Sequence, residues 1–194
     1  AGLLALYMVS IGGVLILIPL LFSILFGYLY TAGPFSLAYL GISDLFVLIF
    51  FGFVATAGTT FLQTKTMLTT SILAGMGPGF LSMALLALNN LRDVKEDTLA
   101  NKKTLPVRFG EQFGKMQYVG CIIGAALSPF LIVIVTGHHF LLLSTWLVLC
   151  SHYPHVKTLF SKKAVENIAP LFKKATKISI LYMLFFTISY LINI

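Results

Sequence analysis

The uncharged stretches of this chain decide the environment in which it can fold. No charged side chain occurs in residues 1–43. Several further apolar runs follow, each of about 17 to 22 residues, which as helix is enough to cross the ~30 Å hydrocarbon core of a bilayer. Only 10% of the residues are charged and 58% are hydrophobic, which excludes an ordinary soluble domain. Because the runs lack the alternation of barrel strands, the sequence predicts an all-α, multi-pass membrane bundle.

The positions of the runs predict about six membrane spans and a helix stub. Residues 2–9 are expected to be the end of a helix that turns at residues 10–13, and Ser43 or Asp44 is expected to cap the helix that follows the first loop. The spans are expected at residues 14–30, 45–62, 67–88, 116–136, 139–153 and 178–194, and residues 154–177 are expected to be a basic loop or surface helix. All 194 residues are expected to form one transmembrane domain.

The basic residues predict the orientation of the spans. Six of the 13 Lys and Arg residues lie in residues 92–115 and six in residues 157–177, whereas Lys65 alone falls in a loop of the opposite side. Because basic loops stay in the cytoplasm, the loops at residues 31–43, 91–115 and 154–177 are expected to face it, in a bacterial cell membrane. The net charge of +7 then reflects membrane orientation and contact with lipid, so no nucleic-acid partner is expected.

Residues 89–110 concentrate charge at the end of an apolar run. They hold three of the six acidic residues and five of the 13 basic ones. If the helix continues past residue 88, then Asn90, Asp93 and Asp97 share one face, because residues three and four apart are neighbours. Hard oxygen ligands of this kind suit Mg²⁺, which is usually completed by water and substrate phosphates. The alternative is a solvated helix end whose acids pair with Arg92 or with nearby lysines.

Two patches of the sequence also carry a family resemblance. Asn89-Asn-x-Arg-Asp-x-x-x-Asp97, followed by Lys102-Lys-Thr-Leu-x-Val-Arg-x-Gly110, resembles the second Asp-rich motif of the UbiA-type intramembrane prenyltransferases. Within that superfamily it is most similar to the 1,4-dihydroxy-2-naphthoate polyprenyltransferases. Residues 28–34, 41–47 and 50–52 resemble the segment that links the family's fourth and fifth helices.

The resemblance implies a reaction and a set of site residues. The implied reaction transfers a polyprenyl chain from its diphosphate to 1,4-dihydroxy-2-naphthoate, with Mg²⁺, to give demethylmenaquinone. Asp93 and Asp97 are the implied catalytic residues and, with Asn90, the implied metal ligands. Lys103 is the preferred candidate for binding the diphosphate, with Lys102 and Arg108; the alternative for these three is positive-inside charge alone.

Further residues are candidates for the substrate pocket, and the resemblance sets the extent of the chain. The candidates are Asn89, Arg92, Tyr28, Tyr30 and Asp44, although interfacial aromatics and an ordinary helix cap explain the last three equally well. The family bundle has nine helices and an earlier Asp-rich motif that has no equivalent here. The chain is therefore expected to be N-terminally incomplete and inactive by itself.

Two other functions compete with this interpretation. Another UbiA branch would use a different aromatic acceptor, and an ion-coupled transporter would place Asp93 and Asp97 on an ion pathway. Transporters place such groups near the bilayer midplane, whereas these two residues follow the end of a span. The four histidines do not form a convergent set, and Cys121 and Cys150 lack the spacing of a zinc site or disulfide framework.

Overall fold

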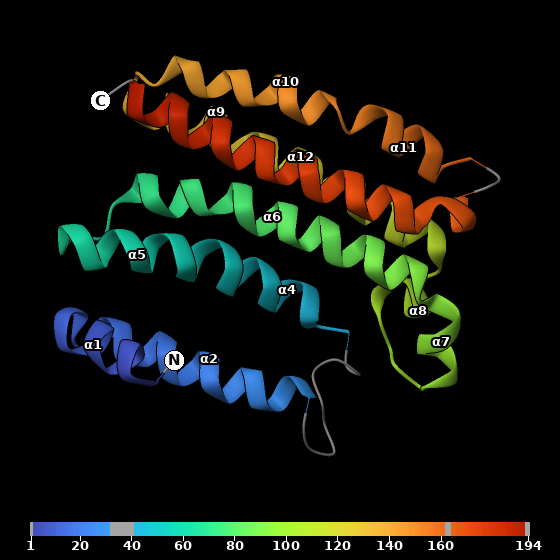
Figure 1. The fold of residues 1–194 in the computed structure, drawn as a ribbon, viewed down its shortest axis with the longest axis horizontal. Helices are drawn as coiled ribbons and strands as arrows, with labels where there is room; N and C mark the ends of the chain where they lie inside the picture. The colour runs from blue at the N-terminus through green and yellow to red at the C-terminus, as the bar shows by residue number, and fades with distance from the viewer. Residues whose placement is uncertain (1, 32–40, 162–163, 193–194) are drawn as a thin grey trace.

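The computed structural model describes residues 2–31, 41–161 and 164–192, and within these ranges the regular structure is entirely helical (Figure 1). The helices run along a common direction and form an elongated bundle. Their bounds are α1 Gly2–Gly12, α2 Val14–Thr31, α4 Ser43–Val47, the π-helix η1 Leu48–Val54, α5 Ala55–Thr64, α6 Thr69–Arg92, α7 Val94–Leu99, α8 Leu105–Phe109, α9 Glu111–Thr136, the 3₁₀-helix η2 Phe140–Ser144, α10 Thr145–Cys150, α11 Tyr153–Leu159 and α12 Ala164–Ile192. The all-α prediction is confirmed.

Four helical segments of the described chain are long and apolar enough to cross a membrane: Ser43–Thr64, Thr69–Arg92, Glu111–Thr136 and Ile168–Ile192. They correspond to four of the predicted spans. The first predicted span coincides with α2, an 18-residue helix of which residues 14–29 form an apolar segment of the described chain. The N-terminal stub is also present, as α1, and the chain turns at Gly13.

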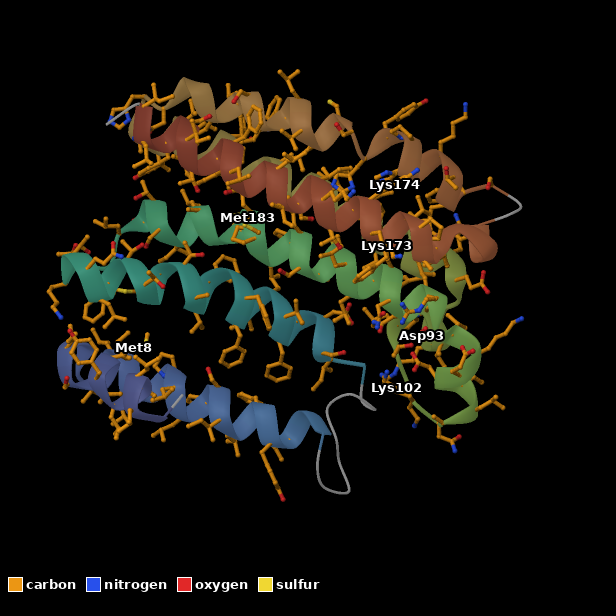
Figure 2. All side chains as sticks on the ribbon, viewed as in Figure 1. Met8, Asp93, Lys102, Lys173, Lys174 and Met183 are labelled. Carbon is orange, nitrogen blue, oxygen red and sulfur yellow. The ribbon has the colours of Figure 1, made fainter. Side chains whose placement is uncertain are left out.

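The region from residue 139 to residue 177 differs from its prediction. The expected span at residues 139–153 is divided into η2, α10 and the first residue of α11. Pro154, in the first turn of α11, has no backbone N–H with which to continue α10. Of the two alternatives for residues 154–177, a basic loop or a surface helix, the structure has helix over most of the segment, in α11 and in α12 from Ala164. Lys173 and Lys174 therefore stand on a helix (Figure 2).

Helix α6 is the centre of the bundle, in contact with η1 on one side and with α9 and α12 on the other. The contact with η1 is close because it is made by glycines: a Cβ atom on Gly52 would lie 2.6 Å from the carbonyl oxygen of Gly75. On the other side, buried Ala87, Leu88 and Tyr118 form a core with residues of α11 and α12. This packing fixes the position at which α6 ends and the charged segment begins.

The two ends of the bundle differ in their connections. At one end, which we call the charged end, α7 and α8 connect α6 to α9, and the start of α4 and the junction of α11 with α12 lie at the same end (Figure 1). At the other, which we call the tight-turn end, short turns join α5 to α6 and α9 to η2. The predicted loops at residues 91–115 and 154–177 therefore share one end; residues 32–40 of the third lie outside the described residues.

Candidate active site

The charged end begins where α6 stops. Asp93 lies between α6 and α7 with φ −97° and ψ 13°, outside helical geometry. The hydrogen-bond ladder nevertheless continues, from Asp93 N to the Asn89 oxygen at 3.1 Å and from Asp97 N to the Asp93 oxygen at 2.8 Å. The predicted single helix is thus bent at this point. Asn90 and Asp97 are buried, whereas Asp93 is partly exposed, so the three side chains do not share one environment.

Asp93 is held by the arginine next to it. Arg92 donates from Nε to Oδ1 of Asp93 at 2.6 Å and from Nη2 to Oδ2 at 2.8 Å. The same Nη2 donates to Oδ1 of Asn89 at 2.7 Å. The hydrogen bonds from the guanidinium lower the pKa of the Asp93 carboxyl below its ordinary value, so Asp93 is ionised at neutral pH. Asp93 therefore makes the ion pair with Arg92 that the alternative of a solvated helix end predicts.

Asp97 has a different environment, with 6% of its surface exposed. Lys102 Nζ donates to its Oδ1 at 3.0 Å, and the Lys102 backbone N–H donates to its carbonyl oxygen at 2.8 Å. Asn101 makes this return possible by adopting a left-handed conformation at φ 55°. Oδ2 of Asp97 is buried without a hydrogen-bond partner (Figure 2 shows Lys102 and Asp93 at this end).

The free atoms at this site suit a hard cation. Besides Oδ2 of Asp97, Nδ2 of Asn90 is buried without a partner, and rotation of that amide by 180° would bring its oxygen to the same position. A buried carboxylate oxygen without a donor is costly, and a cation relieves that cost. In the described parts of the chain no three His, Cys, Asp or Glu residues cluster as metal ligands. A cation here would need ligands from water or substrate, as Mg²⁺ usually has.

The predicted diphosphate-binding residues follow Asp97 in the chain. Lys102 is paired with Asp97, Lys103 is exposed, and Arg108 is in the last turn of α8. Between them, Thr104 is 1% exposed, and its Oγ1 has no hydrogen-bond partner. The connection from α7 to α8 therefore presents cationic side chains together with a buried, unpaired hydroxyl.

The tertiary structure brings the two patches of the family resemblance together. Gly41 has φ +70°, and a Cβ atom there would overlap the carbonyl oxygen of Lys103 and lie 3.3 Å from Nε of Arg108. Only a residue without a side chain allows this approach. The start of α4 is thereby held against the basic connection, although about 60 residues separate them in sequence.

The other predicted pocket residues have different positions. Tyr28 is 65% exposed on α2, and the side chain of Tyr30 lies outside the described residues. The prediction that Ser43 or Asp44 caps a helix was wrong, because α4 begins at Ser43 and its cap residue, Ile42, makes no side-chain cap bond. Asp44 is instead buried, and its Oδ1 accepts a hydrogen bond from Nε2 of Gln117 at 2.6 Å.

Gln117 is a candidate site residue that the sequence analysis did not identify. It lies on α9 near the charged end, and its Oε1 is buried without a partner. The only signal in the sequence was an uncharged polar residue at the start of a predicted span. Two histidine contacts likewise have no signal in the sequence. His152 Nδ1 is hydrogen-bonded to the Tyr118 hydroxyl at 2.6 Å, and the ring centroids of His152 and His155 are 5.7 Å apart.

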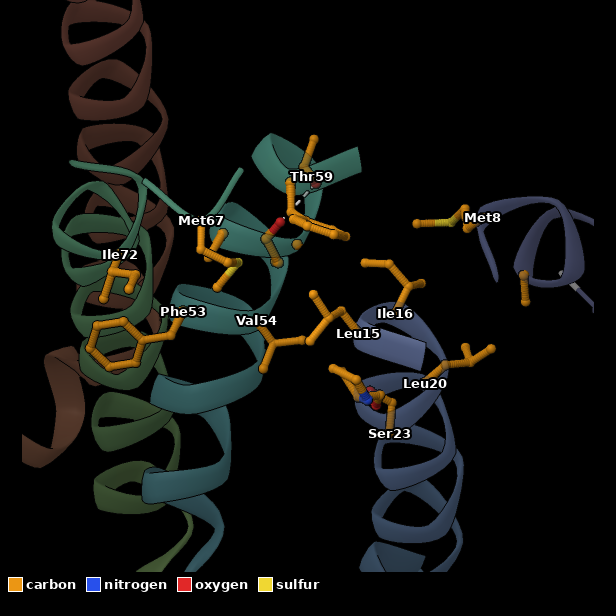
Figure 3. Close-up of a pocket in the computed structure, with 16 residues that line it drawn as sticks. Met8, Leu15, Ile16, Leu20, Ser23, Phe53, Val54, Thr59, Met67 and Ile72 are labelled. Carbon is orange, nitrogen blue, oxygen red and sulfur yellow. Dashed lines mark hydrogen bonds between the residues drawn. The ribbon is translucent and has the colours of Figure 1, made fainter. Parts of the chain in front are cut away.

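An apolar cavity of about 590 Å³ lies between α1 and α2 on one side and η1 and α5 on the other (Figure 3). Its lining includes Met8, Ile16, Leu20, Phe53 and Met67. The hydroxyls in the lining are already satisfied, since Ser23 donates to the Pro19 oxygen and Thr59 to the Ala55 oxygen, each at 2.7 Å. With no polar atom in need of a partner, this cavity suits a hydrocarbon group.

These features define a class: a polytopic membrane protein whose acidic and basic residues meet at one end of its helices. The chain matches the UbiA prenyltransferase family over residues 1–190, and it belongs to that family.

Curated relatives are similar to the chain over part of their length. A 1,4-dihydroxy-2-naphthoate octaprenyltransferase of Haemophilus influenzae is 31% identical over 84% of this chain and 53% of that protein. The Escherichia coli protein of the same name is 37% identical over 54% of this chain and 34% of its own length. A 2-carboxy-1,4-naphthoquinone phytyltransferase of Synechocystis is 34% identical over 47% of this chain and 30% of that protein. The matched region thus spans 53% of the first of these proteins and 30–34% of the other two. No solved structure matches it.

Proposed function

We propose that this chain forms part of a membrane prenyltransferase that moves a polyprenyl group from its diphosphate to 1,4-dihydroxy-2-naphthoate. The observation that carries the proposal is the buried Asp97, whose free Oδ2 lies at the bundle end that also holds Lys102, Lys103 and Arg108. A metal-bound diphosphate requires a carboxylate that holds the metal cation, next to basic side chains that bind the phosphate oxygens. The names of the curated relatives support this donor and acceptor.

The proposed roles follow from the chemistry of each side chain. Asp93, Asp97 and Asn90 would hold Mg²⁺, which when bound supplies positive charge to the oxygens of the leaving diphosphate. Asp97 offers its free oxygen directly, whereas Asp93 must exchange its Arg92 partner. Arg92, Asn89 and Asp93 are joined by hydrogen bonds, so the exchange also frees the Asn89 amide for the substrate pocket.

Lys103, Lys102 and Arg108 would bind the diphosphate itself. Arg108 offers a forked set of donors and the two lysines offer point charges, so together they favour charge that develops on the oxygens as the bond to the prenyl carbon breaks. That bond's electron pair leaves with the diphosphate. A ring carbon of the acceptor then forms the new carbon–carbon bond, and the acceptor's carboxylate leaves as carbon dioxide, giving the demethylmenaquinone carbon skeleton.

The apolar parts of the bundle support a lipid-like donor. A long prenyl chain stays in hydrocarbon while its diphosphate stays at the aqueous edge, and the acidic residues lie at the end of α6 rather than in its middle. We propose that the apolar cavity beside α2 takes part of the prenyl chain, and that the charged end faces the cytoplasm, in keeping with its basic residues.

The decisive assay offers substrates to membranes that contain the complete gene product. Labelled polyprenyl diphosphate is supplied with 1,4-dihydroxy-2-naphthoate or with 4-hydroxybenzoate, with Mg²⁺ or with excess chelator. We expect a prenylated naphthoate product only with Mg²⁺, and none from 4-hydroxybenzoate. Product from 4-hydroxybenzoate alone would assign the chain to another branch of the family, and Mg²⁺-independent turnover would remove the proposed role of Asp97.

A further inference from the structure

The buried Asp44 and the partly buried Gln117 form a polar pair outside the charged connection. Asp44 is in the first turn of α4 and is 3% exposed. Gln117, on α9, donates from Nε2 to Oδ1 of Asp44 at 2.6 Å. The bond leaves two buried oxygens, Oδ2 of Asp44 and Oε1 of Gln117, without any hydrogen-bond partner. Buried polar atoms are nearly always paired, so two adjacent side chains with a free acceptor each point to a ligand that donates.

The chemistry of the free atoms narrows the kind of ligand. Both are acceptors, so they repel the oxygens of a phosphate and attract an O–H or N–H group. The pair carries a single formal negative charge, and the described residues contain no group of three or more His, Cys, Asp or Glu side chains to complete a cation site. A divalent cation would find a single carboxylate here, against the two of Asp93 and Asp97 at the charged connection. A neutral hydroxyl donor fits the pair better.

The pair also lies close to the residues proposed to bind diphosphate. Gly41, three residues before Asp44, packs so closely on Lys103 that a Cβ atom would overlap the Lys103 carbonyl oxygen. The same Cβ would lie 3.3 Å from Nε of Arg108. A single short segment thus touches the basic connection at Gly41 and carries Asp44, one member of the pair, three residues later. A transferase needs this proximity, because its two substrates must meet.

We infer that Oδ2 of Asp44 and Oε1 of Gln117 share, as a three-centre hydrogen bond, the single hydrogen of a ring hydroxyl of the aromatic acceptor and so orient the ring toward the prenyl carbon. This inference rests on the proposed function and deepens it, since it names the group of the acceptor that is recognised and the two side chains that recognise it. Asp44 and Gln117 are substrate-recognition residues in this proposal, and they do not contact the diphosphate.

The test compares KM values for the two substrates in variants of the complete gene product. Asp44→Asn keeps the shape and still accepts the Gln117 bond, but it replaces Oδ2 by a donor. We expect its KM for 1,4-dihydroxy-2-naphthoate to rise roughly 10- to 100-fold, with KM for polyprenyl diphosphate unchanged. Gln117→Leu should raise the acceptor KM by about 10-fold. If Gln117→Leu lowers the amount of folded protein, the nearly isosteric Asp44→Asn decides the test.

Two controls separate recognition from a general structural effect. Ser128→Ala removes another buried side-chain hydrogen bond of α9, to the Leu73 oxygen at 2.7 Å, and should leave both KM values unchanged. Two acceptors with a single hydroxyl, at ring position 1 or at position 4, should respond differently to Asp44→Asn. The substitution should raise the KM of the acceptor that keeps the recognised hydroxyl, whereas for the acceptor that lacks it Asp44→Asn and wild type should have equal KM values. Equilibrium binding of the acceptor without donor, followed by its fluorescence, should show the same pattern.

The outcomes distinguish this inference from the proposed function. Wild-type transfer together with an unchanged acceptor KM in Asp44→Asn overturns the inference and leaves the function standing. Two other results also overturn it: a rise in the KM for polyprenyl diphosphate rather than for the acceptor, or an equal rise in KM for both single-hydroxyl acceptors. If wild-type membranes prenylate no hydroxylated aromatic compound, the proposed function fails and the inference fails with it.

Discussion

The tight-turn end and the charged end of this bundle treat polar groups in opposite ways. At the tight-turn end, two unrelated segments form the same turn. Thr64 donates to the Thr60 oxygen at 3.0 Å and Thr136 to the Ile132 oxygen at 2.7 Å. Each hydroxyl also accepts a backbone N–H two residues later, at 3.3 Å and 3.4 Å. The hydroxyls of these two turns are thus satisfied within the turns themselves.

At the charged end, buried polar atoms are left without partners. Of the buried unpaired side-chain atoms in the described chain, only Nδ1 of His139 belongs to the tight-turn end. The others lie toward the charged end and belong to Asp44, Asn90, Asp97, Thr104, Gln117, His152 and His155. Unpaired buried groups reduce stability, so a protein retains them where a ligand completes them. The contrast teaches that hydrogen-bond satisfaction, more than charge alone, separates a structural end from a functional one.

The largest effect expected to test this contrast is that of Asp97→Asn. The substitution keeps size and shape but removes the charge that would hold a cation, so prenyl transfer by the complete gene product should fall at least about 100-fold. Thermal unfolding should change little, since the amide oxygen of the new side chain can still accept from Lys102. Lys65→Met is the control at the tight-turn end, where it removes a hydrogen bond to the Ile11 oxygen. Unaltered turnover in Asp97→Asn at limiting Mg²⁺ would end the metal assignment.

The next effect compares two glycines that both have φ +70°. Alanine at either position costs about 1–2 kcal/mol for the left-handed conformation. A Cβ atom at Gly137 would meet open space, whereas one at Gly41 would overlap the Lys103 carbonyl. Gly41→Ala should therefore also displace the basic connection and reduce turnover about 10- to 100-fold. Gly137→Ala should retain wild-type turnover; equal losses in the two variants would show that the Gly41 contact does not position the site.

A smaller effect compares two threonines. Thr136→Val removes a satisfied hydroxyl and should lower the free energy of unfolding by about 1 kcal/mol without changing turnover. Thr104→Val removes a buried hydroxyl that has no partner, so stability should stay the same or rise by up to about 1 kcal/mol while turnover falls. Chemical denaturation with parallel assays measures both. Destabilisation of Thr104→Val equal to that of Thr136→Val would mean that the Thr104 hydroxyl has a structural partner.

The smallest effect is the pH dependence of stability contributed by His155. Burial, and then the charge of Lys174, lower the pKa of this histidine below its ordinary value of 6.5. The unfolded chain therefore binds a proton before the folded chain does, and the free energy of unfolding falls as pH decreases below about 6.5. His155→Gln should flatten this slope below about pH 6.5. An identical slope in the variant would assign the acid sensitivity to other groups.

The sequence alone determined the fold class, the extents of the long helices and the location of the charged motif. These follow from local composition: an apolar run of membrane length must form its hydrogen bonds within itself, so it is helical wherever it lies in the fold. The N-terminal stub, α2, α6 and α9 were therefore predicted closely. The prediction was poorer for residues 139–153, where the helix is divided before Pro154, and for the last span, since α12 begins at Ala164 rather than at residue 178.

The tertiary structure alone decided how the charged motif is used. Spacing placed Asp93 and Asp97 on one helical face, yet the bend at Asp93 leaves one carboxylate with Arg92 and buries the other beside Lys102. Likewise, no local pattern shows that Gln117 meets Asp44 or that Gly41 meets Lys103. Contacts between segments so far apart in sequence depend on how α4, α6 and α9 pack. Packing is a property of all three surfaces together, which is why it decides which buried oxygens are paired and which are left for a ligand.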